Sequence, residues 1–347
     1  MPHTLPTSTD GDDSSLLTVA MPLKNSALCL DQVLDSLSHQ GYPKKSVQII
    51  FVDGYSTDET YDKIMEWTAE HRHEYSEITV LREKSNIPQA RNICLRNSRG
   101  SHILFWDSDV RAPPEGVETL LSHLRDPTIG MTGLPYDVDK SSLFDRVYRA
   151  REPLTPSPVE GLTMGFTMMK REVVERTGFF NERMIGYEDR EYCLRARKNG
   201  YKLIFDPTVR CSHLKPETFL SGRYRERKGA FDYKRFLWYN LAKAPSNIIE
   251  ILKGDPRRQT FKTVYYLIYP LLFLATLLSL TASNLMLTGL GIVYLGLPVV
   301  FHLRKTRGVF YGLAASAIFI TGGVALAYGV ISLILKRSLA SICARLK

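Results

Sequence analysis

The chain has 347 residues, of which 44% are hydrophobic, so it is too long and too apolar to be a disordered tail. Residues 1–222 hold 27 bases and 32 acids, residues 223–262 hold 11 bases and 4 acids, and the remainder holds 7 bases and no acid. The positive charge therefore surrounds the apolar C-terminal third instead of covering a folded domain. This distribution favours a membrane surface as a partner and argues against nucleic acid.

Residues 1–15 predict a disordered lead-in, because they are polar and acidic and lack the basic start and apolar stretch of a secretory signal. The five cysteines are odd in number and scattered, and no two form a CxxC pair. They argue against a disulfide framework or a zinc site and fit the reducing cytosol.

Residues 16–222 alternate apolar strands with amphipathic helices, which is typical of a mainly parallel sheet covered by helices on both faces. The expected strands are 17–21, 47–52, 78–81 and 102–106, and the expected helices are 27–39, 57–70, with Ser56 or Thr57 as its cap, and a third from Pro88 to Gly100. In such sheets ligands gather at the carboxyl ends of the strands, so polar residues there are the first candidates for a site.

Acids follow two of these strands. Asp53 ends the second, and Asp107 and Asp109 follow the fourth with one residue between them. A carboxylate at such an edge accepts hydrogen bonds from a base or ribose, or binds a hard cation through oxygen. Turn formation or helix capping is the competing interpretation of an Asp-x-Asp triplet.

A second acidic pair, Glu188 and Asp189, opens an expected helix that continues to Gly200. Asp189 would then project from the first helical turn, although acids at a helix N-terminus are also favoured simply by the helix dipole. His213 follows a strand-like segment. It is a candidate metal or phosphate contact, with a structural role as the alternative.

Residues 223–262 interleave bases with aromatic residues, which predicts helices lying at a lipid interface; plain inter-domain helices are the alternative. Residues 263–282, 285–301 and 309–335 contain no charged side chain, and about 20 helical residues cross a hydrocarbon core of roughly 30 Å. We expect transmembrane helices within 263–337, about three in number, followed by a basic tail at 338–347.

The topology of these crossings is not fixed by the sequence. Arg304, Lys305 and Arg307 separate the second and third apolar runs, so this loop and residues 223–262 are expected to face the cytoplasm. Three crossings would place the basic tail outside, against the positive-inside rule. The third run contains Gly322 and Gly323 and is long enough to bend or re-enter, so two or four crossings stay open.

Six segments, in this order, resemble the family 2 glycosyltransferases with a GT-A fold. They are VAMPLKN (19–25), IIFVDGYSTDET (49–60), IPQARN (87–92), ILFWDSDV (103–110), GFTMMKREVVERTGFFNERM (165–184) and YEDREYCLRARKNGY (187–201). The resemblance spans about 17–214. It implies a GT-A nucleotide-sugar-binding domain over 16–222 and an inverting transfer of a sugar from a nucleotide-diphosphate donor, with Mg²⁺ or Mn²⁺ as cofactor.

Carried over by position, the resemblance assigns the donor to Pro22, Asn25, Asp53, Arg91 and Asp107. Asp53 would bind the nucleotide base and Asp107 the ribose or the donor sugar, whereas Arg91 would contact the nucleotide unless it is a solvated helix arginine. The chain departs from the family pattern in two places. Lys24 stands where an aromatic residue often precedes Asn25, and Gly54 stands where a second acid is common.

For the chemistry, the resemblance implies that Asp109 binds the metal, with His213 as a further candidate. It makes Asp189 the base that takes the proton from the acceptor hydroxyl, with Glu188 beside it to orient the acceptor. A base of this kind is needed when a hydroxyl displaces a nucleoside diphosphate with inversion.

The favoured interpretation is an integral protein of the cell membrane with its catalytic domain in the cytoplasm. It would be a metal-dependent hexosyltransferase that acts on a hydroxyl of a lipid-linked saccharide or glycolipid. One alternative is a polyprenyl-phosphate sugar synthase, whose acceptor phosphate is already ionised and needs no base. The other is a non-catalytic membrane scaffold or transporter subunit, whose spans should carry a polar pathway.

Overall fold

The computed structural model describes residues 16–137, 146–147, 149–184, 186–214, 241, 256–306 and 308–345. The predicted lead-in and most of the predicted interfacial segment lie outside these residues. The chain divides into two compact units. Of the described residues, 16–137 and 153–214 belong to the first unit, and those within 146–152 and from 241 to 345 belong to the second.

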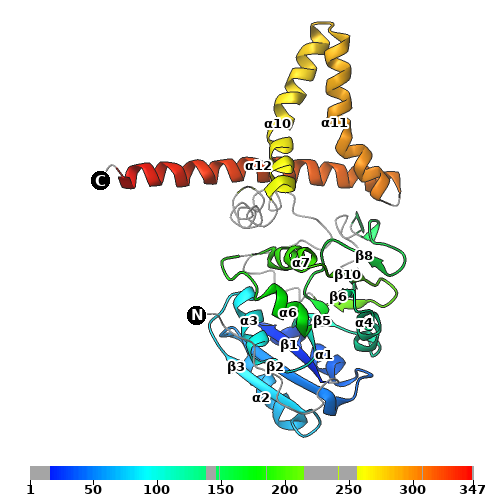
Figure 1. Cartoon of the computed structure of the whole chain (residues 1–347), viewed down its shortest axis with the longest axis vertical. Helices are drawn as coiled ribbons and strands as arrows, with labels where there is room; N and C mark the ends of the chain where they lie inside the picture. The colour runs from blue at the N-terminus through cyan, green and yellow to red at the C-terminus, as the bar shows by residue number, and fades with distance from the viewer. Residues whose placement is uncertain are drawn as a thin grey trace. The chain divides into compact units, whose positions relative to one another are not determined.

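The first unit is built on an eight-stranded sheet with the strand order β3-β2-β1-β4-β9-β6-β10-β8 (Figure 1). Its strands are β1 (Leu17–Leu23), β2 (Val47–Asp53), β3 (Glu77–Arg82), β4 (His102–Trp106), β6 (Ile129–Gly133), β8 (Ser157–Pro158), β9 (Phe166–Lys170) and β10 (Lys202–Phe205). The pairs β1·β2, β1·β4, β2·β3 and β6·β10 are parallel, whereas β9 is antiparallel to both of its neighbours and β8 is antiparallel to β10. The sheet is therefore mainly parallel, as predicted.

Helices cover both faces of this sheet, and each face has its own apolar core. The helices are α1 (Ala27–Ser38), α2 (Thr60–His71), α3 (Ile87–Asn97), α4 (Gly116–Leu124), α6 (Arg171–Thr177) and α7 (Glu188–Lys198). Side chains of α1, α2 and α4 pack on Val19 and Met21 of β1, whereas those of α3, α6 and α7 pack in the core that contains Ala20. The alternation along β1 follows from the two-residue period of a strand.

Helix α2 begins later than the sequence predicted. Its first residue is Thr60, and neither Ser56 nor Thr57 caps it. The Ser56 hydroxyl donates instead to the Asp53 carboxylate and accepts from the Asn25 backbone, so this segment is held as a loop. The Asp58 carboxylate accepts from the Thr60 backbone N–H at 3.1 Å and aligns the first turn. A competing side-chain bond therefore moved the helix start.

A second, three-stranded sheet lies beside the first and has the order β5-β11-β7. Its strands are β5 (Val110–Arg111), β7 (Tyr136–Asp137) and β11 (Cys211–His213). It joins residues about 75 to 100 positions apart in the chain, because His213 pairs with Val110 and Cys211 with Tyr136.

Gly100 is a position where the fold requires glycine. A Cβ atom there would lie 2.5 Å from the Thr18 backbone N and 2.7 Å from the Leu16 carbonyl oxygen. We expect Gly100→Ala to destabilise the first unit by about 3 kcal/mol, because backbone atoms cannot move aside as a flexible side chain does. Thermal unfolding followed by near-UV circular dichroism should show a Tm roughly 5–10 °C lower. Gly161→Ala is the matched control, since its Cβ would meet nothing within 4 Å; an equal loss in both variants would contradict the steric explanation.

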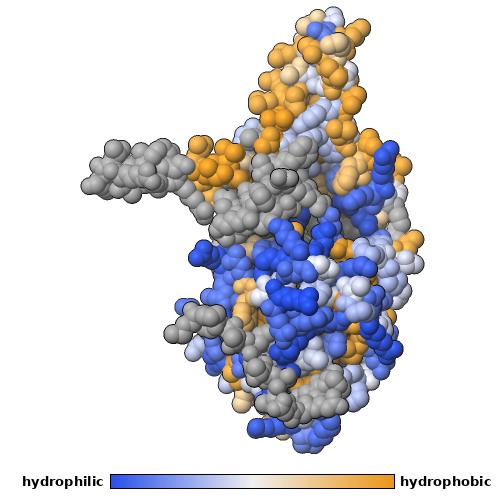
Figure 2. Space-filling model, in the orientation of Figure 1, coloured by the Kyte–Doolittle hydropathy of each residue, from blue (hydrophilic) through white to orange (hydrophobic). Residues whose placement is uncertain are grey.

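The second unit contains three long helices, α10 (Pro256–Thr281), α11 (Leu285–Lys305) and α12 (Val309–Arg345). Each contains a segment long and apolar enough to cross a membrane: Val264–Thr281, Leu285–Lys305 and Val309–Lys336. Figure 2 shows the hydrophobic side chains that α10 and α11 expose. The phenol of Tyr265 on α10 donates to the Tyr294 carbonyl on α11 at 3.0 Å, and this bond joins the two helices.

Helix α12 is continuous through Gly322 and Gly323 and extends to Arg345. The backbone of the predicted basic tail is therefore helical up to that residue. The structure thus contains three candidate spans among the described residues, in agreement with the simplest prediction.

Candidate active site

Arg91 lies at the centre of a group of acids at the carboxyl edge of the large sheet. Its side chain is buried, with one guanidinium nitrogen 2.5 Å from Glu188 Oε1 and another 3.4 Å from Asp107 Oδ1. The guanidinium also lies over the rings of Phe105 and Phe180, 5.9 and 5.7 Å from their centroids. The alternative of a solvated arginine is wrong, because Arg91 is buried, and its contact to a nucleotide stays a prediction.

Local sequence explains how Arg91 reaches this position. The Asn86 side chain accepts from the Gln89 backbone N–H at 2.9 Å and the Gln89 side chain accepts from the Asn86 backbone N–H, which forms a capping box at the start of α3. Pro88 stabilises the first turn of the same helix. Glu188 starts α7 directly after Tyr187, whose φ of 59° lies in the left-handed region. The two helix starts therefore fix the guanidinium and the carboxylate that meet.

Asp109 and His213 meet through the small sheet. The antiparallel pairing of β5 with β11 places His213 opposite Val110, the residue after Asp109. As a result Asp109 Oδ2 lies 3.3 Å from His213 Nε2, and the Leu214 backbone N–H donates to the Asp109 carbonyl at 2.6 Å. The two residues that were predicted as metal ligands are therefore neighbours.

These two donors suit a divalent cation that is shared with a ligand. No group of three or more His, Cys, Asp or Glu side chains that could hold a metal ion occurs in the part of the chain that the structure describes. A cation at Asp109 and His213 would therefore need further oxygen atoms from a bound molecule, and a diphosphate supplies such oxygens. The donor set fits a metal of this shared kind.

Tyr136 interacts with both groups of acids, and no pattern in the sequence marks it. Its ring lies 5.4 Å from that of His213, and its phenol interacts electrostatically with Asp107, Asp109 and Asp189. Burial first, and then these three carboxylates, raise the pKa of Tyr136, so the phenol is neutral at physiological pH. Gly165 leaves room for the ring, because a Cβ there would lie 2.8 Å from it. The acids predicted for catalysis and for metal binding thus act electrostatically on one phenol.

Asp189 has the electrostatics of a general base. Burial, followed by the neighbouring Glu188 carboxylate, raises the pKa of Asp189 to about 6, while the Arg190 backbone N–H and the Arg91 guanidinium act in the opposite direction. The Arg190 N–H donates to Asp189 Oδ1 at 2.6 Å. A carboxylate of this kind is ionised at pH 7 but more basic than an exposed one, which suits proton abstraction.

This pKa leads to a pH prediction. A base acts in its deprotonated form, so activity should be full above the pKa of Asp189 and fall as the pH drops below about 6. We expect kcat/KM to fall about tenfold per pH unit on this acid limb. The measurement is initial rate against pH between 5 and 8 at saturating metal. A flat profile from pH 5 to 7 would show that no group with this pKa acts as the base.

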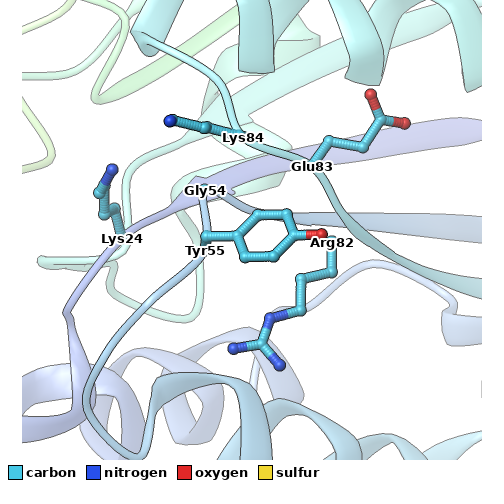
Figure 3. A pocket seen from close by; sticks show the side chains of 6 residues that line it. All are labelled: Lys24, Gly54, Tyr55, Arg82, Glu83 and Lys84. Carbon is cyan, nitrogen blue, oxygen red and sulfur yellow. The ribbon is translucent and has the colours of Figure 1, made fainter.

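Asp53 lies in a separate part of the same edge, beside an open pocket of about 650 Å³. The pocket is lined by Lys24, Gly54, Tyr55, Arg82, Glu83 and Lys84 (Figure 3). The Asp53 side chain is fully buried, and Arg82 Nε lies 3.1 Å from its Oδ2. The pocket is therefore lined by Arg82 and Tyr55 and not by Asp53 itself.

The remaining predicted donor residues make contacts within the chain. Pro22 is buried in β1 opposite Val52. The Asn25 side chain accepts from the Thr57 backbone N–H at 2.8 Å and so ties the loop after β1 to the loop after β2. Lys24, between them, lines the pocket.

Comparison with known proteins identifies the domain that carries these residues. The description "Glycosyl transferase family 2" matches residues 18–180, which include Asp53, Arg91, Asp107 and Asp109. The chain carries a family 2 glycosyltransferase domain. Among solved structures, a mannosyltransferase from Pyrobaculum calidifontis in complex with GDP-Man and Mn²⁺ is similar in fold, with a TM-score of 0.56 and 20% identity over 88% of this chain and 86% of that one. The family 2 domain has the GT-A fold, as the resemblance implied.

Two curated relatives are also glycosyltransferases. The glycosyltransferase AglE of Haloferax volcanii is 23% identical over 61% of this chain and 72% of its own length. A dolichyl N-acetyl-alpha-D-glucosaminyl phosphate 3-beta-D-2,3-diacetamido-2,3-dideoxy-beta-D-glucuronosyltransferase of Methanococcus voltae is 22% identical over 86% of this chain and 90% of its own length. Both relatives are glycosyltransferases, as is the family described over residues 18–180, so the comparisons favour an enzyme over the non-catalytic alternative.

Proposed function

We propose that this family 2 glycosyltransferase moves a sugar, with inversion, from a nucleotide-diphosphate donor to a hydroxyl of a lipid-linked saccharide or glycolipid. The observation that carries the proposal is the group formed by Arg91, Glu188, Asp107 and Asp189, which combines a buried cation with a carboxylate of raised pKa. The reaction needs both an ionised base for the acceptor hydroxyl and a site that tolerates a highly charged leaving group.

In this proposal Asp189 takes the proton from the acceptor hydroxyl while that oxygen attacks the anomeric carbon. Glu188 is held by Arg91 at 2.5 Å and orients the acceptor, and its negative charge keeps Asp189 basic. Asp107, whose side chain is about one third exposed, is placed to accept a hydrogen bond from the ribose or donor sugar.

A divalent cation would be held by Asp109 and His213 together with the donor diphosphate. When bound, it would neutralise the charge that develops on the leaving diphosphate. A carboxylate suits both Mg²⁺ and Mn²⁺, whereas an imidazole nitrogen is a softer donor than Mg²⁺ prefers. We therefore favour Mn²⁺ over Mg²⁺ at this site.

The acceptor assignment is supported by the candidate membrane spans in α10, α11 and α12. An enzyme anchored in this way works at a bilayer surface, where a lipid-linked saccharide is concentrated and a soluble nucleotide sugar arrives from the cytoplasm. The name of the Methanococcus voltae relative specifies a dolichyl-linked sugar phosphate. Since Asp189 has the character of a base, a hydroxyl acceptor is favoured over the ionised phosphate used by a polyprenyl-phosphate sugar synthase.

The test is to incubate the full chain, purified in detergent, with UDP- and GDP-linked sugars, Mn²⁺ or Mg²⁺, and a membrane lipid extract. We expect release of nucleoside diphosphate that requires one donor, a divalent cation and the lipid extract together. Release at the same rate without lipid extract would indicate hydrolysis and contradict the lipid acceptor. No release from any donor would contradict the proposed transfer.

A further inference from the structure

Tyr55 adopts a backbone conformation that is unfavourable for a tyrosine. Its φ is 58°, in the left-handed region where glycine is the usual residue. The preceding residue is Gly54. The glycine therefore stands one position before residue 55, where the positive φ would favour a glycine. A strained residue of this kind persists when the surrounding structure or a function holds it there.

The ring of Tyr55 is not held by burial. The residue is 54% exposed and lines the pocket beside Lys24, Arg82 and Lys84. Figure 3 shows the ring extending from Gly54 toward Arg82, whose guanidinium carbon lies 5.3 Å from the ring centroid. Packing in a core therefore does not explain why a large aromatic residue occupies this strained position.

Asp53, the residue expected to bind the nucleotide base, is not accessible from this pocket. Its carboxylate is fully buried and accepts from the Ser56 backbone N–H at 3.1 Å, from the Ser56 hydroxyl and from Arg82 Nε at 3.1 Å. The buried Asp53 carboxylate thus holds the guanidinium of Arg82 through Nε, and Arg82 Nη2 donates to the Ser56 carbonyl at 3.2 Å. Two of the five N–H groups of Arg82 are used in this way.

We propose that Tyr55 and Arg82 bind the base of the nucleotide donor, and that Asp53 acts through Arg82 as a positioning residue. Tyr55 provides the stacking face, and Arg82, 40% exposed, directs its remaining N–H groups to the edge of the base. Aromatic side chains at an open surface are effective platforms for base stacking. This inference rests on the proposed nucleotide donor and names the residues that select it.

The hydrogen-bonding chemistry of Arg82 restricts which nucleotide bases the pocket can bind. A guanidinium only donates hydrogen bonds, so it suits a base edge that carries carbonyl oxygens, as uracil and guanine do. Adenine carries no carbonyl oxygen, and its amino group donates beside the ring-nitrogen acceptors, so it offers Arg82 fewer acceptors on one edge. The pocket is therefore expected to take a uridine or guanosine diphosphate in preference to an adenosine diphosphate.

The experiment is isothermal titration calorimetry of the full chain in detergent with Mn²⁺, using UDP, GDP, ADP and inorganic pyrophosphate as titrants. We expect wild type to bind UDP or GDP at least about tenfold more tightly than ADP. Tyr55→Gly should lower the affinity for the preferred nucleotide by about tenfold or more, which is the effect of losing one stacking contact. The affinity for pyrophosphate should stay unchanged. Tyr55→Phe should keep wild-type affinity. Because glycine relieves the strained φ, Tyr55→Gly should not lower Tm.

Tyr61→Leu is the matched control. The Tyr61 ring lies 4.4 Å from the same guanidinium but does not line the pocket, so its loss tests whether Tyr55 merely supports Arg82. The inference would be overturned if Tyr61→Leu lost as much nucleotide affinity as Tyr55→Gly, or if Tyr55→Gly bound pyrophosphate equally weakly. Unchanged nucleotide binding by Tyr55→Gly would overturn it too. None of these results would contradict the proposed class of donor. ADP binding as tight as UDP and GDP would also overturn the inference. If wild type binds no nucleoside diphosphate, the proposed donor and this inference fail together.

Discussion

Replacing Asp189 by asparagine should lower kcat by roughly 10²–10⁴-fold, the range that loss of a general base gives. The amide keeps the shape of the side chain but cannot take the proton from the acceptor hydroxyl. Donor nucleotide and metal affinity should stay near wild type, because neither is assigned to Asp189. The measurements are single-turnover transfer to lipid acceptor and, separately, nucleotide binding with Mn²⁺.

Glu191→Gln is a suitable comparison for Asp189→Asn. Glu191 lies in the same first turn of α7, but its carboxylate pairs with Arg195 Nε at 2.7 Å, outside the acidic group around Arg91. We expect this variant to retain most of the transfer rate. Full turnover by Asp189→Asn would remove Asp189 as the base, and an equal loss in both variants would indicate damage to the start of α7.

Asp109→Asn should raise the Mn²⁺ concentration needed for half-maximal activity by on the order of 10–100-fold, because even an outer-shell change at a metal site has an effect of this size. His213→Ala should act in the same direction, since His213 Nε2 lies 3.3 Å from Asp109 Oδ2. The measurement is the metal dependence of the transfer rate after treatment with chelator.

The chain contains a matched histidine–carboxylate pair for this experiment. His123 Nε2 lies 2.7 Å from Asp206 Oδ2, away from the predicted ligands, and the Asp206 carboxylate also accepts from the Thr208 backbone N–H at 2.8 Å. Asp206→Asn should lower stability without altering the Mn²⁺ requirement. Activity of the wild-type chain that is unchanged in chelator would contradict a metal at Asp109.

Much of the domain could be predicted because its signals are local. The strands are continuous apolar runs, and Pro88 and Gly100 mark a helix start and a helix end that the structure confirms within a few residues. The acids at strand ends were identified because the carboxyl edge of a parallel sheet is where ligands bind. The alternation of strands and helices predicted the mainly parallel sheet, and the resemblance of six segments to the family 2 glycosyltransferases implied the GT-A fold.

Contacts between distant segments were not predictable in the same way. Arg91 and Glu188 are 97 positions apart, and Tyr136 is brought next to β11, which carries His213, by the pairing of β7 with β11. No local pattern marks Tyr136. The predicted start of α2 was wrong because the Ser56 hydroxyl donates to Asp53. This bond depends on the buried carboxylate at the end of β2.

Tyr55 had a signal that sequence reasoning did not use. Gly54 stands where a second acid is common in the family, and the residue with positive φ is the next one, Tyr55. The burial of Asp53 then leaves the exposed surface to Tyr55 and Arg82. The departure therefore identifies a residue gained as well as a residue lost.

In the proposed mechanism, one bound nucleotide and metal are contacted by Asp109, His213, Asp107 and Asp189 together. The most direct test of this arrangement is anomalous diffraction from crystals of the full chain grown with Mn²⁺ and a nucleoside diphosphate. We expect one manganese peak, coordinated by Asp109, His213 and the diphosphate, with the Asp189 carboxylate facing the bound diphosphate. A manganese ion bound by other residues, or Asp189 turned away from the diphosphate, would contradict it.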